Sequence, residues 1–498
     1  MRYRIALTSA SAIVLLGMVG ALSGPAWDPV PMTSTIDVAS PDTAIRTVPG
    51  ASPVGTFDVV TSVVTVQLTG ATVEAQITEP VGASGLRPAV VFVHGAGTGR
   101  YQEAFVTQAR DLASAGVVTM VPDKRLDTYS MRHRDYVAMA NDYLRSLELL
   151  RGLPGVDPDL VGVYGESEGC WIVPVMAADN AHVAFVMLVA APVVSPRQQA
   201  GFAVDSYLRA TGVPVEVLRA IPRIVGMRLP GGGFAYEDFD VQPFQQRMRQ
   251  PVFVAYGTGD AAMPTIQGAL QIIDDLTTAG NSGWTVRYYQ GADHGIKIDK
   301  VLVPDFPRDL AAWVQSLPAS AGAVPRVAGA DPYQRFLAGP VDRPRWFAEG
   351  DLLVAALVTL GCALLVGPAV WMVRRLRGRR SSMLADGVRL PLTVMTVSGL
   401  ASFVGFVVYL LVVANLAQGY RTNALVVQGG WLTVRMLAIM SVVAGVVLVY
   451  RVLDGRRRRG IRASRNQGGA VLLAGNVAGS VLLLSLLSYW NAFPPLHL

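Results

Sequence analysis

The most constraining feature of this sequence is a set of four apolar segments in its last third, near residues 351–373, 390–416, 431–450 and 470–490. Each is about long enough to cross the roughly 30 Å hydrocarbon core of a bilayer as a helix. The mean hydropathy of +0.39 and the charged fraction of 16% also separate this chain from ordinary soluble proteins. We therefore expect residues 351–498 to form an all-α transmembrane region of four helices.

The basic residues are concentrated beside these segments. Five arginines follow the first segment and seven follow the third. They are Arg374, Arg375, Arg377, Arg379, Arg380, Arg451, Arg456, Arg457, Arg458, Arg459, Arg462 and Arg465. These twelve exceed the net charge of +6, so the rest of the chain is net negative and no nucleic-acid partner is expected. Arginine-rich short loops stay in the cytoplasm, so loops 374–389 and 451–469 are predicted to be cytoplasmic, and connection 417–430 to lie outside.

The N-terminus carries a second topological signal. Arg2 and Arg4 precede an apolar run, which makes residues 1–26 a signal peptide or an N-terminal membrane anchor; the sequence leaves open whether it is cleaved. Residues 27–55 and 318–350 are predicted to be linkers. The export signal and the arginine distribution give the same orientation. We expect a multi-pass protein of the cell membrane whose middle domain is extracytoplasmic.

Strand and helix patterns alternate between residues 56 and 317. Two β-rich runs, Phe57–Leu68 and Ala71–Ile77, predict a hairpin. Buried-strand runs then alternate with helical patterns, which predicts an α/β domain with a mostly parallel sheet. The alternation stops over residues 193–250, which we interpret as a partly helical cap insertion. Its aromatic residues include Phe234, Tyr236, Phe239 and Phe244.

The strongest chemical motif is Gly165-Glu166-Ser167-Glu168-Gly169, which lies between a predicted strand and a predicted helix. Glycines at both ends allow the sharp turn that exposes a nucleophilic serine above the edge of a sheet. The string alone is a weak signal, but its position after a strand and before a helix strengthens it. Ser167 is therefore the candidate nucleophile.

A serine nucleophile needs a histidine base and an orienting carboxylate, which follow it in the order Ser, Asp, His in this kind of domain. The chain has five histidines, His94, His133, His182, His294 and His497. Only His294 comes directly after the last predicted strand, and Asp260 follows the strand before it. Asp293 is a poorer choice of carboxylate, because a residue adjacent in sequence seldom points at the imidazole.

The same reaction needs hydrogen-bond donors for the developing oxyanion. The backbone amide of Glu168 supplies one by its position after the nucleophile, and Ala96 in the loop after an early strand supplies the second. Cys170 and Cys362 are the only cysteines, so neither a disulfide framework nor a cysteine metal site is predicted. No metal or organic cofactor is expected, and protein partners are not indicated.

Six strings give the region 56–317 a resemblance to a known family. They are Val93-His94-Gly95-Ala96-Gly97, Pro122-Asp123-Lys124-Arg125, Val156-Asp157-Pro158, Gly165 to Gly169, Gly257-Thr258-Gly259-Asp260 and Asp293-His294-Gly295. With them the chain resembles bacterial α/β-hydrolases of the esterase, dienelactone hydrolase and prolyl-oligopeptidase kind. Leu126 stands where that family commonly has glycine. The resemblance implies an α/β-hydrolase fold and a serine hydrolase, a carboxylic ester hydrolase above all.

Several alternatives stay open at this stage. The expected substrate is a small-molecule or lipid-like ester, and a serine peptidase, an acyltransferase or a non-catalytic binding domain of a membrane protein are the other possibilities. His94 is interpreted as a brace for its turn. Arg435 either snorkels to the outer interface or lies within the third span. Gly475 and Gly479 are either a helix contact or incidental.

Overall fold

The computed structural model describes residues 2–129, 134–228, 230, 238–378, 382–419 and 421–494. The chain divides into two compact units, and both are discontinuous in sequence. The first, here called the sheet unit, consists of Pro29–Ala203 and Tyr236–Pro340. The second, here called the helical unit, consists of Met1–Asp28, Val204–Ala235 and Val341–Leu498.

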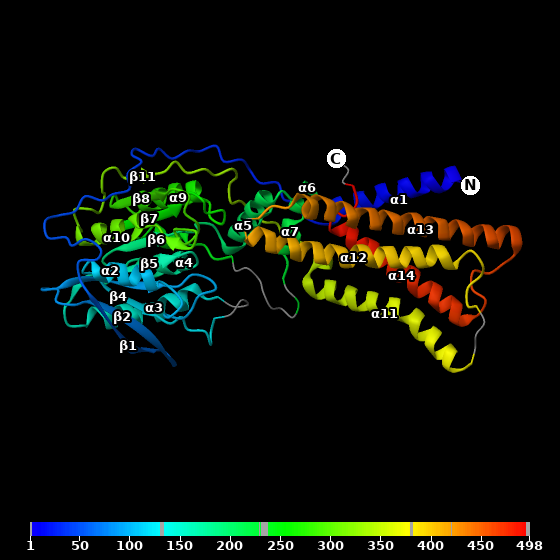
Figure 1. Ribbon diagram of the computed structural model, residues 1–498, viewed down its shortest axis with the longest axis horizontal. Helices are drawn as coiled ribbons and strands as arrows, with labels where there is room; N and C mark the ends of the chain where they lie inside the picture. Colours follow the sequence, from blue (N-terminus) through cyan, green and yellow to red (C-terminus); the bar gives the residue numbers. More distant parts are fainter. Residues whose placement is uncertain are drawn as a thin grey trace. The chain divides into compact units, whose positions relative to one another are not determined.

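A large sheet forms the centre of the sheet unit (Figure 1), with the described strands in the order β1-β2-β4-β3-β5-β6-β7-β8-β11. β1 and β2 form an antiparallel hairpin and β2 is antiparallel to β4, whereas the other neighbours are parallel. The strands are β1 (Val59–Leu68), β2 (Ala71–Pro80), β3 (Arg87–Val93), β4 (Val118–Pro122), β5 (Val156–Glu166), β6 (Val186–Val189), β7 (Val252–Gly257), β8 (Trp284–Tyr289) and β11 (Val327–Gly329). The predicted hairpin and mostly parallel α/β sheet are confirmed.

Helices cover both faces of this sheet. They are α2 (Val106–Ser114), α3 (Tyr136–Arg151), α4 (Gly169–Ala177), α9 (Thr265–Thr278) and α10 (Asp305–Gln315). Leu147 of α3, Ile172 of α4 and Ile272 of α9 belong to one apolar core, and Leu112 of α2 and Trp313 of α10 belong to another. β6 and β7 are apolar and buried along their whole length, and β3 is so from Ala89 onward, because both faces of these strands are covered.

Parts of the two predicted linkers, 27–55 and 318–350, are ordered at the edge of the sheet. The short strand β11, within residues 318–350, extends the sheet beside β8. The extended segment after Pro29 lies along it, with the Ala39 amide donating to Val327 O at 3.2 Å. The buried Arg287 guanidinium donates to Thr43 O at 2.7 Å. Backbone pairing and one buried arginine order these segments, which lack the apolar periodicity that a sequence reading detects.

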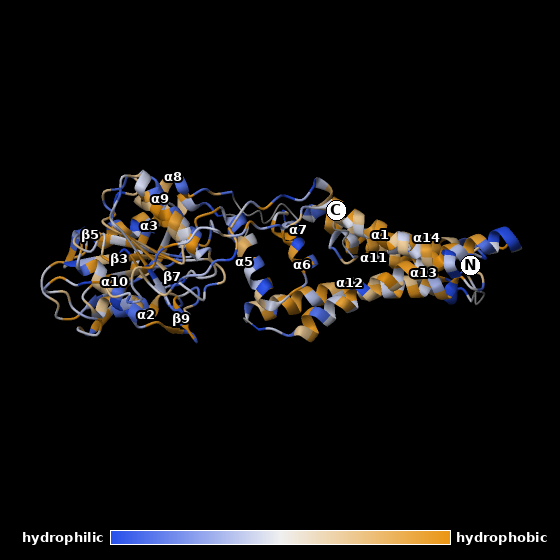
Figure 2. Ribbon diagram, turned by 90° about the horizontal axis from the view of Figure 1, so that it is seen from above, coloured by the Kyte–Doolittle hydropathy of each residue, from blue (hydrophilic) through white to orange (hydrophobic). Residues whose placement is uncertain are grey.

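The helical unit contains five described helices that are long and apolar enough to cross a membrane, by length and composition. They are α1 (Arg2–Ser23), α11 (Gly350–Leu376), α12 (Arg389–Gln418), α13 (Gly430–Arg459) and α14 (Gln467–Tyr489). Figure 2 shows apolar residues along all five helices. This agrees with the predicted four C-terminal segments and the apolar N-terminal run. Gly475 and Gly479 of α14 lie against Ala363 and Leu364 of α11, so the glycine pair is a helix contact.

Helix α1 packs closely inside the helical unit. The buried Gly17 and Gly20 leave no room for a Cβ, because the carbonyls of Pro494 and Ser488 lie directly against them. The Ser488 hydroxyl donates to Leu16 O. At the other end of α1, Thr8 Oγ1 lies 3.1 Å from the hydroxyl of Tyr450, next to the arginine-rich end of α13. The basic start of α1 and the arginines that follow Tyr450 therefore lie at the same end of the unit.

The described part of the stretch predicted as a cap contains four short or medium helices and is divided between the units. They are α5 (Pro196–Thr211), α6 (Val215–Arg219), α7 (Ile221–Val225) and α8 (Gln242–Gln245). Residues 204–235 belong to the helical unit, and α8 belongs to the sheet unit. The predicted cap residues Phe234 and Tyr236 lie outside the described residues.

Two charged residues of the inserted stretch explain its place in the helical unit. Glu216 of α6 forms a 3.0 Å ion pair with Arg435 of α13. The buried Arg223 of α7 donates to Pro25 O at 3.0 Å and also to Tyr489 O, at the ends of α1 and α14. Arg435 is therefore paired with a carboxylate of the inserted stretch, a partner that neither sequence interpretation included.

Candidate active site

Ser167 lies in a sharp turn between β5 and α4. Its φ of 56° is in the left-handed region, which a residue with a side chain adopts only where the surroundings impose it. The Ser167 amide donates to Val189 O at 3.0 Å. A Cβ on Gly169 would lie 2.5 Å from Val93 O, so only glycine permits α4 to start this close to β3. The turn therefore has the strand, strain and helix expected of a nucleophile elbow.

His294 and Asp260 form the second part of the site. His294 Nδ1 lies 2.8 Å from Asp260 Oδ2, and the Asp260 carboxylate is fully buried, whereas 31% of the His294 side chain is exposed. The Gly259 amide donates to Ala292 O at 2.9 Å, which joins the loop after β7 to the loop after β8. Because the carboxylate can only accept, the imidazole carries its proton on Nδ1 and leaves Nε2 available as a base.

The charges around His294 make its imidazole unusually basic. Burial by itself lowers the pKa of His294, but the Asp260 carboxylate and its hydrogen bond, together with the nearby Glu166 and Asp293, raise that pKa to about 9. Burial in turn raises the pKa of the Glu166 carboxyl, which also accepts a hydrogen bond from Tyr164 at 3.1 Å. The electrostatic influence of Glu166 on His294 connects the residue before the nucleophile to the candidate base.

Ser167, Asp260 and His294 follow the carboxyl ends of β5, β7 and β8, at one edge of the parallel part of the sheet. The structure joins Asp260 to His294 by a hydrogen bond, and among the described residues it records none between Ser167 and His294. Catalytic hydrogen bonds are often long in a site without substrate. The three residues therefore lie on loops at the same edge of the sheet, Asp260 and His294 after the adjacent strands β7 and β8, and Ser167 after β5, on the other side of β6.

The two candidate oxyanion donors belong to loops that touch each other. A Cβ on Gly95 would lie 3.2 Å from the Ser167 Cβ, so the loop that carries Ala96 passes directly beside the elbow. Within the described ranges, neither the Ala96 amide nor the Glu168 amide donates to a backbone carbonyl. Two unpaired amides beside a serine are the donors that a developing oxyanion requires.

The Glu168 side chain has a further role that the sequence reading did not assign. Lys124 Nζ lies 3.0 Å from Glu168 Oε2, and 1% of each side chain is exposed. Lys124 also donates to Gly95 O at 2.7 Å. Arg134 and Tyr129 donate to the same carboxylate at 2.7 and 2.9 Å. Lys124 thus joins the oxyanion loop to the nucleophile elbow, and the string Pro122-Asp123-Lys124-Arg125 was its only sequence signal.

His94 and Cys170 are buried close to Ser167 and are structural. His94 Nε2 donates to Pro122 O at 2.8 Å, and burial, opposed by this hydrogen bond, lowers the pKa of His94 to about 4. Its neutral ring braces the turn, as expected. The Cys170 thiol donates to Gly165 O at 3.1 Å, and burial raises its pKa, which keeps it protonated. His182 is half exposed beside Glu148, and His133 and His497 lie outside the described residues.

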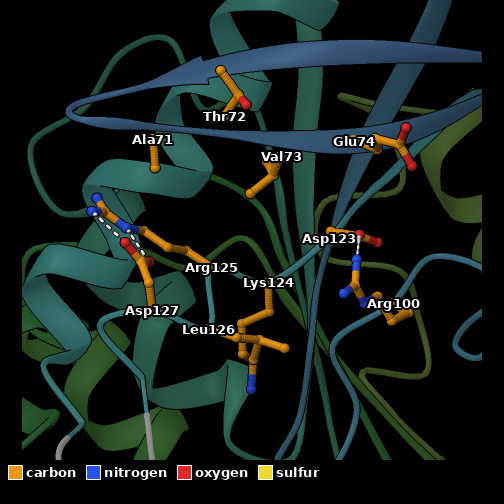
Figure 3. Close-up of a pocket in the computed structure, with 10 residues that line it drawn as sticks. All are labelled: Ala71, Thr72, Val73, Glu74, Arg100, Asp123, Lys124, Arg125, Leu126 and Asp127. Carbon is orange, nitrogen blue, oxygen red and sulfur yellow. Dashed lines mark hydrogen bonds and ion pairs between the residues drawn. The ribbon is translucent and has the colours of Figure 1, made fainter.

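A cavity of about 300 Å³ lies between the β1–β2 hairpin and the loop after β4 (Figure 3). It is lined by Ala71, Thr72, Val73, Glu74, Arg100, Asp123, Lys124, Arg125, Leu126 and Asp127. Four of its charged residues form two ion pairs, Arg125 with Asp127 at 2.7 Å and Arg100 with Asp123 at 2.8 Å. In Figure 3 the Lys124 ammonium points away from the hairpin. It donates to Gly95 O and to the Glu168 carboxylate, neither of which lines the cavity. Among the described residues the Glu74 carboxylate has no ion-pair partner, so the cavity offers one negative charge to a ligand.

Phe239 connects the inserted stretch to the surroundings of the elbow. The centroid of its ring lies 4.9 Å from that of the Tyr136 ring. The Tyr136 centroid in turn lies 5.4 Å from that of the Trp171 ring in α4. The Tyr136 hydroxyl donates to Glu168 at 3.4 Å.

In the part of the chain that the structure describes, no group of three or more His, Cys, Asp or Glu side chains could hold a metal ion.

Comparisons with known proteins found similar solved structures. No family model matches the sequence, and no curated protein is similar enough to count as a match. An esterase from Pyrobaculum calidifontis is 19% identical, with 53% of this chain and 87% of the esterase covered and a TM-score of 0.39. Est1E from Butyrivibrio proteoclasticus is 14% identical, with 52% and 98% covered and a TM-score of 0.36.

Dipeptidyl peptidase 4 from Porphyromonas gingivalis is 16% identical, with a TM-score of 0.35, and this chain, of which 48% is covered, spans 33% of the peptidase's length. At these identities and scores the likenesses say nothing about activity. The fold assignment instead rests on the topology, in which an antiparallel hairpin leads into parallel strands, β3 and β4 exchange places, and a strained serine follows β5. By that strand order and that turn, the sheet unit has the α/β-hydrolase fold.

Proposed function

We propose that this chain is a membrane-tethered serine hydrolase that cleaves an ester on the outer side of the membrane. The observation that carries the proposal is the 2.8 Å hydrogen bond between His294 Nδ1 and the buried Asp260. It orients an imidazole on the loop that follows β8, at the edge of the sheet where the strained Ser167 is partly exposed. A structural histidine at a surface loop has no need of a fully buried carboxylate partner.

The proposed reaction proceeds through an acyl-enzyme. His294 Nε2 takes the proton of the Ser167 hydroxyl as its oxygen attacks the ester carbonyl. The amides of Ala96 and Glu168 donate to the oxyanion of the tetrahedral intermediate. His294 then protonates the departing alcohol, the carbonyl re-forms, and a water molecule activated by the same imidazole releases the acid. Asp260 holds the imidazolium in place, and no metal or organic cofactor takes part in these steps.

The outer location is supported by charge. The arginine-rich ends of α11 and α13 and the basic start of α1 favour the cytoplasm. The connection from α12 to α13 carries only Arg421 and favours the outside. With these helices as spans, the sheet unit is connected to chain segments that leave the membrane at the outer side.

Labelling with a fluorophosphonate probe tests the nucleophile. We expect the full-length protein in detergent to react once, and Ser167→Ala to lose both the label and nearly all turnover, about 10⁶-fold in kcat. Ser195→Ala is the matched control, because this serine lies in the next loop of the sheet unit and has no assigned role. Labelling that persists in Ser167→Ala would overturn the mechanism.

The leaving group distinguishes the ester hydrolase from the same-fold alternatives. We expect turnover of p-nitrophenyl esters and none of the matching p-nitroanilides. Preferential cleavage of the anilides would indicate a peptidase. Transfer of the acyl group to an added alcohol, faster than to water, would indicate an acyltransferase.

A further inference from the structure

The loop that carries Asp260 is held by a side chain from the inserted stretch. Gln199 lies near the start of α5, the first helix of that stretch. Its side-chain amide donates to Ala262 O at 2.5 Å, and the Ala262 backbone amide donates to Asp260 Oδ1 at 2.8 Å. The other carboxylate oxygen, Oδ2, is the one that bonds to His294. A continuous series of hydrogen bonds therefore connects α5 to the candidate base.

The start of α5 is itself fixed to the core of the sheet unit. The Trp171 indole of α4 donates to Val194 O at 3.1 Å, and the Tyr256 hydroxyl of β7 donates to Ala191 O at 2.9 Å. Both donor side chains are buried. The segment between β6 and α5 is therefore tied to a helix and a strand of the core, and Gln199 extends from a fixed position toward the Asp260 loop.

The burial of Gln199 argues that its hydrogen bond has a purpose beyond packing. The residue is 5% exposed, and among the described residues its Oε1 has no hydrogen-bond partner. A buried acceptor without a donor costs free energy, which a methionine of similar length would avoid. Stability alone therefore does not explain a glutamine at this position, whereas the bond from its amide to Ala262 O does.

We propose that Gln199 is a positioning residue, which holds the loop after β7 so that the Asp260 carboxylate stays bonded to Nδ1 of His294. This inference rests on the proposed function, in which Asp260 orients the base. Without the Gln199 amide, the Ala262 carbonyl loses its donor and the loop can move the carboxylate away from the imidazole. The inserted stretch thus contributes to the site through α5, by orienting the acid of the triad.

The basicity of His294 tests this role without any substrate. The full-length protein, labelled with ¹³C at its histidines, is titrated in detergent by NMR, and the His294 signal is assigned by its loss in His294→Gln. The carboxylates that act on this imidazole are those of Asp260, Glu166 and Asp293. In Gln199→Met the Asp260 carboxylate is held less closely, and we expect the pKa of His294 to fall by about one unit.

Two further measurements separate positioning from a structural role. Gln199→Met also removes the unpaired Oε1, so its thermal unfolding should resemble that of the wild type. Wherever an ester is turned over, kcat should fall about 10²-fold while KM changes little, because a displaced base affects the chemical step. Gln250→Met is the matched control. Gln250 donates to Ala177 O at 2.8 Å from beside the amino end of β7, so its loss should leave the pKa of His294 unchanged.

Asp260→Asn distinguishes failure of this inference from failure of the proposed function. If Asp260→Asn lowers the pKa of His294 and Gln199→Met does not, the role of Gln199 is overturned. If neither does, the triad is overturned and the inference with it. A fall in both variants, in a protein that hydrolyses no ester, would support Gln199 and contradict ester hydrolysis. Should Gln199→Met fail to fold, Gln199→Asn, whose amide is one methylene short of Ala262 O, is judged by the same pKa criterion.

Discussion

Lys124 and Glu168 form an ion pair of 3.0 Å in which 1% of each side chain is exposed. A pair this deeply buried contributes little net stability by itself, because both charges lose their hydration. Its importance lies in what it connects, since Lys124 also donates to Gly95 O and Glu168 follows the nucleophile. We therefore expect the pair to hold the two candidate oxyanion amides in place, with Lys124 as a positioning residue.

Removal of one member of this pair should lower the free energy of unfolding more than removal of both. Lys124→Met leaves the Glu168 carboxylate buried without its ammonium, and we expect it to lower the free energy of unfolding by about 3 kcal/mol. Lys124→Met combined with Glu168→Gln should recover most of that loss in denaturant unfolding. If the double variant is soluble, its kcat should remain well below that of the wild type while its KM changes little. The reason is that Lys124 no longer connects the oxyanion loop to the nucleophile elbow. An additive loss in the double variant would argue against the coupling.

Asp260 and Asp293 offer a test of which carboxylate orients the base. Asp260→Asn should reduce kcat/KM by about 10³- to 10⁴-fold, because the amide no longer stabilises the imidazolium. Asp293→Asn is the control: its carboxylate accepts from the Gly295 and Lys297 amides at 3.0 Å and holds the turn. A larger loss in Asp293→Asn than in Asp260→Asn, with both proteins folded, would reverse the assignment.

The pKa of His294, raised to about 9, predicts an alkaline pH dependence. The base must be neutral to accept the serine proton, so kcat/KM should increase with pH and reach half its limit near pH 9. Glu166→Gln removes a negative charge that favours the imidazolium, and its midpoint should move to lower pH. Glu103→Gln, which removes an exposed carboxylate, should leave the midpoint unchanged. An identical midpoint in Glu166→Gln would show that Glu166 does not act on His294.

The packing of α1 predicts that this helix remains part of the membrane protein. The intact mass of the purified protein should include residues 2–26, since the removal of α1 would expose the surface of α14 around Ser488. Gly20→Leu should reduce the yield of folded protein, because the Ser488 carbonyl occupies the space of a side chain. Leu15→Phe, at an exposed position of α1, is the control. A mature protein that begins after Ala26 would contradict this prediction.

Cysteine accessibility tests the orientation of the spans. In a variant with Cys170 and Cys362 replaced by alanine, single cysteines at Ser282, Ser381 and Ser464 are exposed to an impermeant thiol reagent in intact cells. Ser381 lies outside the described residues. Labelling of the cysteine at Ser282 alone is expected, because the arginine-rich loops resist translocation. Labelling at Ser381 or Ser464 without Ser282 would reverse the topology.

Local signals in the sequence account for most of the fold. The glycines around Ser167, the valine-rich strands and the 20-residue apolar segments each act within a few neighbours, so their patterns predict the elbow, the sheet and the spans. The placement of Asp260 and His294 could be predicted from the order of strands, because carboxyl ends of parallel strands meet at one edge.

Contacts between distant parts of the chain could not be predicted in the same way. Lys124 and Glu168 are 44 positions apart, and Glu216 and Arg435 are 219 apart. A charged residue in a loop has the same sequence signature whether it is solvated or buried with a partner. The strand β11 has three residues and no alternation, and only its pairing with β8 identifies it.

The hydrogen bonds of Arg223 affect how this protein can be dissected. One guanidinium holds the ends of α1 and α14 together with α7, a helix that the chain forms between two strands of the sheet. A fragment that ends before Val341 would therefore keep α5, α6 and α7 without the helices that cover them. The apolar side chains of these three helices would then be exposed to water. Such a fragment should aggregate even though its sheet is complete, and a soluble form of the sheet unit would require replacement of residues 204–235 by a short polar loop.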